Sequence, residues 1–418
     1  MSLTVRDARL DDAVVAVRVE GDRIVALGAG VEPAAGDEVL DAAGMVLLPG
    51  LVNGHTHAAM TLMRGYGGDL PLMKWLQDKI FPVEAKLTGD DVYWGTRLAC
   101  VEMIRSGTVR FWDMYWQPEA VGRAVQDAGI RASVALPLVD GLDPDKSDAL
   151  HADAERSLDA LADAGRRITP TLGPHSIYLL SEKSLRWIAD LSSERDICVH
   201  IHLSETEGEV KDCVAAHGVR PAPYLDRIGL LTPRTILAHG VWLDDDELQL
   251  VGERGATIVT NPVSNLKLAV GGVFPYAKAR AHGIPVGLGT DGASSNNSLD
   301  LFQDVKHLAL MQKHAERDPA AMPATEAWAV ASGQRAPLLG GTGRLAVGEP
   351  ADFLLVRSDA PELTPGELVA NLVYAAAGAV VDTTVVAGQV LMRGGVIGDE
   401  AEVRAGAVAS ARRLGVIE

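Results

Sequence analysis

The sequence predicts an α/β protein: a (β/α)₈ (TIM) barrel with a small β-sandwich domain formed by both chain ends. Three observations predict this fold. Short β-branched runs alternate with helical stretches through the middle of the chain, β-rich segments occur at both ends, and histidines and an aspartate stand where several of the runs end. We expect residues 1–48 and 345–418 to be the two parts of the sandwich, and residues 49–344 to form the barrel.

Both ends of the chain have β patterns. The N-terminal runs flank a turn-like Glu20–Asp22, and the last two C-terminal runs flank Ala387-Gly388. These runs are Val14–Val19, Arg23–Ala26, Ala351–Val356, Thr383–Val386 and Gln389–Met392. Neither end has enough strands to bury a face alone, so we expect the two ends to fold together.

The middle of the chain contains eight runs that are typical of parallel strands, with helical candidates such as Asp91–Ile104, Ser181–Ser193 and Glu205–His217 between them. The runs are Leu47–Val52, Thr108–Tyr115, Ala132–Leu136, Ile168–Leu172, Ile197–His202, Thr235–His239, Thr257–Thr260 and Ile284–Thr290. Eight such units closing on themselves make a barrel of about 250 residues.

Composition excludes several classes of protein. With 38 basic and 56 acidic residues the net charge is −18, which argues against a nucleic-acid partner. No apolar run reaches the length of a membrane span and the first residues lack a secretory pattern, so a cytoplasmic location without membrane contact is expected. The cysteines Cys100, Cys198 and Cys213 include no CxxC pair, which argues against a disulfide framework or a thiolate zinc site.

Polar residues mark the ends of the predicted strands. The first run leads to His55 and His57, the fifth ends at His202, the sixth at His239, and the eighth is followed by Asp291. Active sites of TIM barrels lie at the carboxyl ends of the strands and combine residues from several of them. These side chains are therefore expected to converge on one site.

The residue types at this site predict a metal centre. His55 and His57 are two residues apart and can face the same side. Of the similar pair His200 and His202, we expect His202 to be the ligand and His200 to lie deeper in the barrel. Asp291 directly follows an apolar strand, where a carboxylate is costly to bury unless it is paired or binds a metal. His55, His57, His202 and Asp291 suit Zn²⁺, with Fe²⁺ or Co²⁺ as substitutes.

Two further residues are expected to act in catalysis. Glu205 begins the segment after His202 at the rim of the barrel, where it is well placed as a general acid or base. His239 can hydrogen-bond a hydroxide at the metal. Taken alone, a glutamate at such a position would more often be an ordinary surface residue.

A series of motifs covers nearly the whole chain in order. They are Pro49–His57, Ala59–Gly65, Leu70–Leu72 with Trp75-Leu76, Glu102–Thr108, Asp113–Tyr115, Gly173–His175, His202–Thr206, Ala238–Gly240, Asn261–Leu268 and Gly289–Asn297. On these motifs the sequence resembles the amidohydrolase superfamily. More narrowly, it resembles the branch that holds methylthioadenosine and S-adenosylhomocysteine deaminases together with chloro-s-triazine hydrolases.

The resemblance implies one divalent metal ion per subunit, held by His55, His57, His202 and Asp291. Two-metal relatives use a carboxylated lysine at the end of strand 4, whereas here that strand ends at His175. The resemblance also implies that Glu84 and His175 contact a sugar, that Ser295 can reach the base, and that a homo-oligomer is possible.

The function implied is hydrolytic deamination of adenosine-type nucleosides (5′-methylthioadenosine, adenosine or S-adenosylhomocysteine) with release of ammonia. In this hypothesis Asp291 takes a proton from water, His239 orients the resulting hydroxide and Glu205 protonates a ring nitrogen. The alternatives are a chloro-s-triazine-type hydrolase or a guanine or pterin deaminase on the same metal site, and, from another class, a non-catalytic metal-binding scaffold. The presence of Glu205 favours a substrate whose ring must be protonated, and hence deamination.

The stretch Leu136–Lys146 bears on which nucleoside is preferred. Relatives that accept S-adenosylhomocysteine are expected to meet its carboxylate with arginines beyond strand 3. This stretch has no arginine, and none follows before Arg156. The sequence therefore predicts a preference for uncharged 5′ groups, unless Arg64 or a neighbouring subunit supplies the charge.

Overall fold

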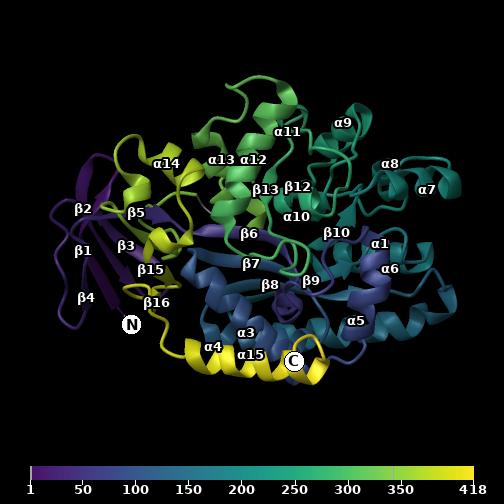
Figure 1. Cartoon of the computed structure of the whole chain (residues 1–418), viewed down its shortest axis with the longest axis horizontal. Coiled ribbons are helices and arrows are strands. Elements are labelled where there is room, and N and C mark those ends of the chain that lie inside the picture. The colour runs from purple at the N-terminus through teal and green to yellow at the C-terminus, as the bar shows by residue number, and fades with distance from the viewer. Residues whose placement is uncertain (1, 342) are drawn as a thin grey trace.

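The computed structural model describes residues 2–341 and 343–418 and contains two sheets of eight strands each (Figure 1). The central sheet runs in order from β6 to β13, and its neighbouring strands pair in parallel. The strands are β6 (Leu51–Thr56), β7 (Thr108–Met114), β8 (Arg131–Leu138), β9 (Ile168–Pro174), β10 (Val199–Leu203), β11 (Thr235–His239), β12 (Thr257–Thr260) and β13 (Val286–Leu288). The predicted (β/α)₈ barrel is confirmed.

The first and last strands of the barrel meet where the site residues lie. The N–H of Asp291 donates to the carbonyl oxygen of His55 at 3.0 Å. The side chains of Asn53 and Thr290 add a second tie, with Asn53 Nδ2 2.7 Å from Thr290 Oγ1. These contacts place residues from the two ends of the sheet side by side.

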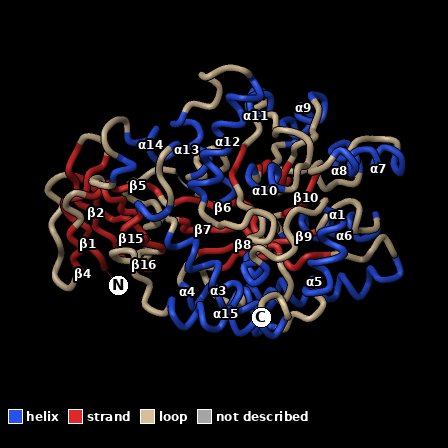
Figure 2. Tube along the Cα trace, viewed as in Figure 1, coloured by secondary structure: helices blue, strands red, loops and turns tan. Residues whose placement is uncertain are grey.

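Helices cover the outside of the barrel, as the blue and red segments of Figure 2 show. Capping boxes start two of them: Thr88 with Asp91 before α3, and Asp244 with Glu247 before α9. The outer helices are α3 (Gly89–Arg105), α4 (Pro118–Ala128), α5 (Ser147–Ala162), α6 (Glu182–Arg195), α7 (Glu207–His217), α8 (Pro221–Arg227), α9 (Asp245–Arg254), α10 (Pro262–Lys267), α11 (Tyr276–Ala281), α12 (Leu301–Glu316) and α13 (Ala324–Ala331).

The chain ends build the second sheet together, as predicted. Its order is β16-β15-β14-β5-β1-β2-β3, and β4 pairs with β1. The strands are β1 (Ser2–Leu10), β2 (Ala13–Glu20), β3 (Arg23–Gly28), β4 (Glu38–Asp41), β5 (Met45–Pro49), β14 (Phe353–Arg357), β15 (Val381–Val386) and β16 (Gln389–Met392). Val5, Val17, Leu47, Phe353 and Val385 belong to one buried apolar cluster, so the two ends share a core.

The run Leu47–Val52, predicted as one strand, is divided between the two sheets. Leu47 pairs with Leu355 in the terminal sheet, whereas Leu51 and Val52 belong to β6. The chain crosses at Gly50: its N–H donates to Asp352, and the next N–H donates to Gly107. A Cβ at Gly50 would lie 2.3 Å from Val109 Cγ1, so only glycine fits this close approach.

The C-terminal helix α15 (Glu400–Leu414) was not predicted and lies along the barrel helix α3 (Figure 1). Arg413 pairs with the buried carboxylate of Asp91. Gly406 allows close contact, because a Cβ there would meet the ring of Trp94. The last residues therefore pack on the barrel, although the strands before them belong to the terminal sheet.

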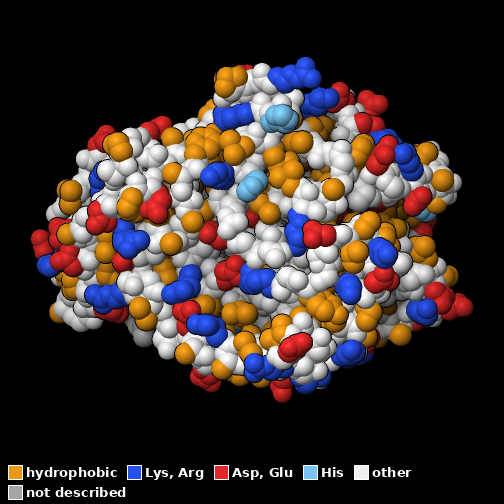
Figure 3. Space-filling view, in the orientation of Figure 1, with side chains coloured by type: hydrophobic (Ala, Val, Ile, Leu, Met, Phe, Trp, Pro, Cys, Tyr) orange, Lys and Arg blue, Asp and Glu red, His pale blue; other side chains and the backbone are white. Residues whose placement is uncertain are grey.

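The surface carries acidic and basic side chains interspersed on the face shown in Figure 3. Within residues 2–341 and 343–418, no helix is long and apolar enough to cross a bilayer. All three cysteines are free thiols.

Candidate active site

A cavity of about 560 Å³ opens at the carboxyl ends of the barrel strands. Its floor holds the polar residues His57, His175, His202, Glu205, His239, Asp291 and Ser295. Its outer wall is largely apolar and comes from α1 (Leu72–Trp75), the π-helical turn η2 (Leu76–Ile80), α2 (Phe81–Glu84) and residues that follow β7 and β8. A polar floor beneath an apolar wall suits a heterocyclic ligand that carries an apolar substituent.

His55, His57 and Asp291 form one close group. Asp291 Oδ1 lies 3.2 Å from His57 Nε2 and 3.5 Å from His55 Nε2. The backbone contact between His55 and Asp291 across the barrel seam brings the histidines of β6 to the aspartate that follows β13. This group offers two imidazole nitrogens and one carboxylate oxygen within the reach of a single cation.

His202 adds a third nitrogen. Its Nε2 lies 3.3 Å from that of His57, and each of these rings uses its Nδ1 on a backbone carbonyl. His57 Nδ1 is 2.7 Å from the oxygen of Met114, and His202 Nδ1 is 2.6 Å from the oxygen of His175. Those Nδ1 atoms donate to the carbonyls, so in the neutral form of each ring Nε2 has a lone pair available to a cation. Without a cation, Asp291 raises the pKa of His57 to about 9 in spite of burial.

His55 shows the same arrangement through another histidine. Its Nδ1 lies 2.9 Å from His200 Nε2, and its buried Nε2 has no hydrogen-bond partner. His200 thus lies behind His55. One cation at this point would satisfy the Nε2 atoms of His55, His57 and His202 and the Asp291 carboxylate together, so the donor set fits a divalent metal ion.

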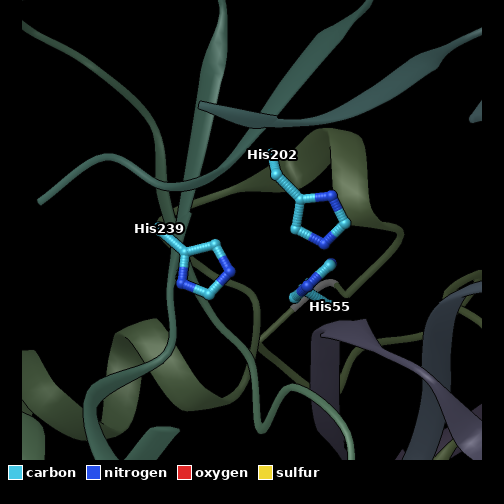
Figure 4. Close-up of side chains that lie close together, drawn as sticks. All are labelled: His55, His202 and His239. Carbon is cyan, nitrogen blue, oxygen red and sulfur yellow. The ribbon is translucent and has the colours of Figure 1, made fainter. Parts of the chain in front are cut away.

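His239 faces the same point from β11. Figure 4 shows His55, His202 and His239 directed toward one another, and one ring nitrogen from each lies within 4.8 Å of the others. His239 Nδ1 is 2.8 Å from Asn265 Oδ1, so it donates there and leaves Nε2 free as an acceptor.

Asp291 is held on the side away from the histidines. Its Oδ2 accepts hydrogen bonds from Ser264 at 2.6 Å and Ser295 at 2.8 Å. Burial alone would raise the pKa of Asp291, but the contacts with His55 and His57 outweigh burial and hold that pKa well below its usual value. Asp291 therefore stays a carboxylate with a fixed orientation.

Glu205 lies in the turn between β10 and α7, and its buried carboxyl belongs to the polar floor of the cavity. Its Oε1 is 3.9 Å from His239 Nδ1. Burial raises the pKa of the Glu205 carboxyl, and the neighbouring His239 partly opposes that rise. Such a group keeps its proton to a higher pH than a surface glutamate, which a general acid requires.

Besides Glu205, the other predicted substrate contacts also line the cavity: Glu84, His175 and Ser295. Burial raises the pKa of Glu84, whereas the neighbouring Trp116 and Tyr115 side chains lower it. The ring of His175 lies against His202, with centroids 4.6 Å apart. The hydroxyl of Ser295 is already engaged by Asp291. The geometry leaves the contacts of these residues with a substrate as predictions.

Several residues of the site were not singled out from the sequence. Ser264 and Asn265 lie on α10, where one holds Asp291 and the other holds His239. Both belong to a motif that contributed to the resemblance, so a signal was present without an assigned role. Glu209 accepts the backbone N–H groups of Ser204 and Glu205, and its only signal is the capping-box spacing from Thr206.

Known proteins resemble this chain over most of its length. The model of the amidohydrolase family matches residues 46–391. The chain is 49% identical to the 5′-deoxyadenosine deaminase of Methanoregula boonei, over 90% of this chain and 86% of that protein. It is 42% identical to 5-methylthioadenosine/S-adenosylhomocysteine deaminase 1 of Archaeoglobus fulgidus, over 92% and 91%.

A solved structure agrees with the fold. The adenosine deaminase of Xanthomonas campestris with bound zinc superimposes with a TM-score of 0.92 at 32% identity, over 99% of both chains. The resemblance seen in the sequence is thereby confirmed. With its fold, its strand-end donor set and these relatives, the chain belongs to the amidohydrolase family.

Proposed function

We propose that this protein is a hydrolytic deaminase of adenosine-type nucleosides that releases ammonia. The observation that carries the proposal is the meeting of bare imidazole nitrogens and the Asp291 carboxylate in a cavity that also holds the buried acid Glu205. Relatives over most of the chain that are called 5′-deoxyadenosine deaminase and methylthioadenosine/S-adenosylhomocysteine deaminase support it.

One divalent ion, with Zn²⁺ the best fit to three nitrogens and one oxygen, would be held by His55, His57, His202 and Asp291. Such an ion supplies the Lewis acidity that activates water for attack at neutral pH. The structure neighbour with bound zinc and the family's metal dependence support this assignment. At the end of β9, where a bridging lysine would stand in a two-metal site, this chain has His175.

The residues of the chain then divide the proton transfers. Asp291 accepts a proton from the attacking water, while Ser264 and Ser295 keep its carboxylate in place. His239 orients the nucleophile through Nε2, because Asn265 holds its other nitrogen protonated. Glu205 donates a proton to the ring nitrogen next to the attacked carbon. The proton held by Asp291 then passes to the amino group, the carbon–nitrogen bond breaks and ammonia leaves. The added hydroxyl becomes the carbonyl oxygen of the product, and its proton returns to Glu205.

The wall of the cavity indicates which nucleosides fit. Among the described residues that line it, none is Lys or Arg. Arg64 is engaged by both carboxylate oxygens of Glu102, and Lys146 forms an exposed pair with Asp143. Leu72, Trp75 and Phe81 instead offer apolar surface. We therefore propose that 5′-deoxyadenosine and 5′-methylthioadenosine are better substrates than S-adenosylhomocysteine.

The direct test is ammonia release by the purified, zinc-loaded enzyme from 5′-deoxyadenosine, with guanine and a chloro-s-triazine as alternative substrates. We expect deamination of the adenosine compound, loss of activity after chelation and recovery with Zn²⁺. Turnover of guanine or the triazine without turnover of any adenosine compound would overturn the proposed substrate class.

A further inference from the structure

We infer that Glu209 is a positioning residue, whose buried carboxylate holds the turn that directs Glu205 into the cavity. The inference rests on the proposed function, because it takes Glu205 to be the proton donor. Glu209 lies in the first turn of α7 and does not line the cavity. Its effect on catalysis must therefore pass through the turn between β10 and α7.

Both oxygens of Glu209 are used on this turn. Oε1 accepts the N–H of Ser204 at 2.8 Å, and Oε2 accepts the N–H of Glu205 at 2.9 Å. One rigid carboxylate thus fixes two consecutive peptide groups, one of which belongs to Glu205 itself. Charge-assisted hydrogen bonds of this kind are stronger than those between neutral groups.

The contact differs from an ordinary helix cap. In α9, Glu247 reaches back to the N–H of Asp244, the N-cap residue, at 3.2 Å. In α7 the N-cap is Thr206, whose hydroxyl accepts the N–H of Glu209 at 3.2 Å. The carboxylate of Glu209 reaches past this N-cap to the two residues before it, so it ties the helix to the catalytic turn.

The turn itself needs such support. Ser204 has a φ of 52°, in the left-handed region that side chains other than glycine rarely adopt. On its other side, the Ser204 carbonyl accepts the N–H of Trp242 at 2.9 Å. The turn is thus held between the end of β11 and the carboxylate of Glu209, which fixes the direction in which Glu205 leaves the backbone.

The burial of Glu209 also fits a specific role. The residue is 7% exposed, and within the described part of the chain no Lys or Arg forms an ion pair with it. Burial raises the pKa of Glu209, whereas the N–H groups of Ser204 and Glu205 lower it, because they donate to the ionised carboxylate. A carboxylate exposed to water could cap α7 at a smaller cost in desolvation. Glu209 is instead buried where its oxygens reach Ser204 and Glu205, which fits a role in holding the turn.

The test is a double-mutant cycle on 5′-deoxyadenosine with Glu209→Gln, Glu205→Gln and the double variant, each with its metal content measured. In Glu209→Gln an amide NH₂ replaces one acceptor and faces a backbone N–H, so the turn shifts without a change in side-chain size. We expect kcat to fall about tenfold to a hundredfold with unchanged metal content. In the Glu205→Gln background the same change should have no further effect on kcat, because the proton donor that Glu209 positions has already been removed.

Glu247→Gln is the control for loss of a buried cap carboxylate. It alters the cap of α9 together with the contacts of Glu247 with Arg220 and Ala222, and because Glu247 does not line the cavity the variant should leave kcat near that of the wild type. Wild-type kcat in Glu209→Gln would overturn the inference, as would an equal fall of kcat in both backgrounds. If Glu209→Gln does not fold, Glu209→Asp replaces it, because the shorter carboxylate cannot reach both N–H groups. An inactive wild-type enzyme would instead refute the proposed function, so the two failures are distinct.

Discussion

The two ends of the barrel have opposite electrostatic character. At the carboxyl ends of the strands, Glu84, Glu205 and Asp291 share the cavity with histidines, and no described lining residue is Lys or Arg. At the other end, Arg110, Arg131 and Arg167 gather at the starts of β7, β8 and β9. One end thus offers lone pairs and carboxylates to a cation and a neutral heterocycle, and the other offers guanidinium groups.

The arginine-rich end connects the two sheets. Arg131 pairs with Asp352, just before β14, at 2.8 Å, and Arg167 Nη2 donates to Gln389 of β16 at 2.7 Å. Burial lowers the pKa of Arg110 to about 10, with Arg131 as a further cause. Buried polar groups thus serve different purposes in one barrel: the ring nitrogens and Asp291 mark the site, whereas the Arg131–Asp352 pair and the Arg167–Gln389 hydrogen bond tie the terminal sheet to the barrel.

The largest expected effect comes from removing a metal ligand. His57→Ala or Asp291→Ala should lower kcat/KM for 5′-deoxyadenosine by several orders of magnitude and abolish bound zinc, because each removes one of four donors. Elemental analysis and ammonia release measure the two effects. Stoichiometric zinc in both variants would contradict the ligand assignment, and two tightly bound ions in the wild type would contradict a single-metal site.

The next largest effect distinguishes the role of Glu205, a proton donor, from the role of the four metal ligands. Glu205→Gln should retain the metal but lose about 10²–10⁴-fold in kcat, because the amide cannot donate a carboxylic proton to the ring. Circular dichroism and elemental analysis serve as controls for folding and metal. Near-normal turnover in this variant would remove Glu205 from the mechanism.

The fold and the donor set could be predicted because both depend on periodic features. Parallel strands bring their carboxyl ends to one rim, so His202, His239 and Asp291 could be placed together without knowledge of any loop. The division of Leu47–Val52 could not be predicted, since it depends on the close approach of Gly50 to Val109.

The roles of the groups that orient the donors could not be assigned from the sequence, although Asn265 lies in a motif and Glu209 has the capping-box spacing. Asn265 and Glu209 act through contacts set by the path of a short helix and a turn, and hydrophobic periodicity carries no information on either. The carbonyl of Met114 that fixes His57 belongs to the backbone, so no residue type could have indicated it. The positions of groups away from the strand ends can therefore be known only from the structure.

The third prediction concerns stability at the arginine-rich end. Arg131→Ala should lower the free energy of unfolding by about 3 kcal/mol, because it leaves the largely buried carboxylate of Asp352 without its cation. Specific activity of the folded enzyme should stay near that of the wild type, since the pair lies at the end opposite the site. Denaturant unfolding followed by fluorescence measures the first effect.

The control for that experiment is the exposed pair of Arg6 and Asp41, with side chains 51% and 55% accessible. Arg6→Ala should lower the free energy of unfolding far less than Arg131→Ala, because exposed ion pairs contribute little to stability. Equal losses in the two variants would show that burial does not distinguish these pairs, and a lower kcat in Arg131→Ala would show that the two ends of the barrel are coupled.

The smallest expected effect tests the absence of cations at the catalytic end. The wild type should process S-adenosylhomocysteine with a kcat/KM about tenfold to a hundredfold below that for 5′-deoxyadenosine, because the carboxylate of S-adenosylhomocysteine loses solvation and gains no charged partner.

Val139 follows β8 and lines the cavity, so Val139→Arg places a guanidinium in the wall where a carboxylate can be bound bidentately. This variant should raise kcat/KM for S-adenosylhomocysteine about tenfold and leave that for 5′-deoxyadenosine unchanged or lower. Val139→Met adds bulk without charge and should give no such gain, so an equal gain would assign the effect to shape. A wild-type preference for S-adenosylhomocysteine would mean that a cation from outside this cavity, such as one from a neighbouring subunit, completes the site.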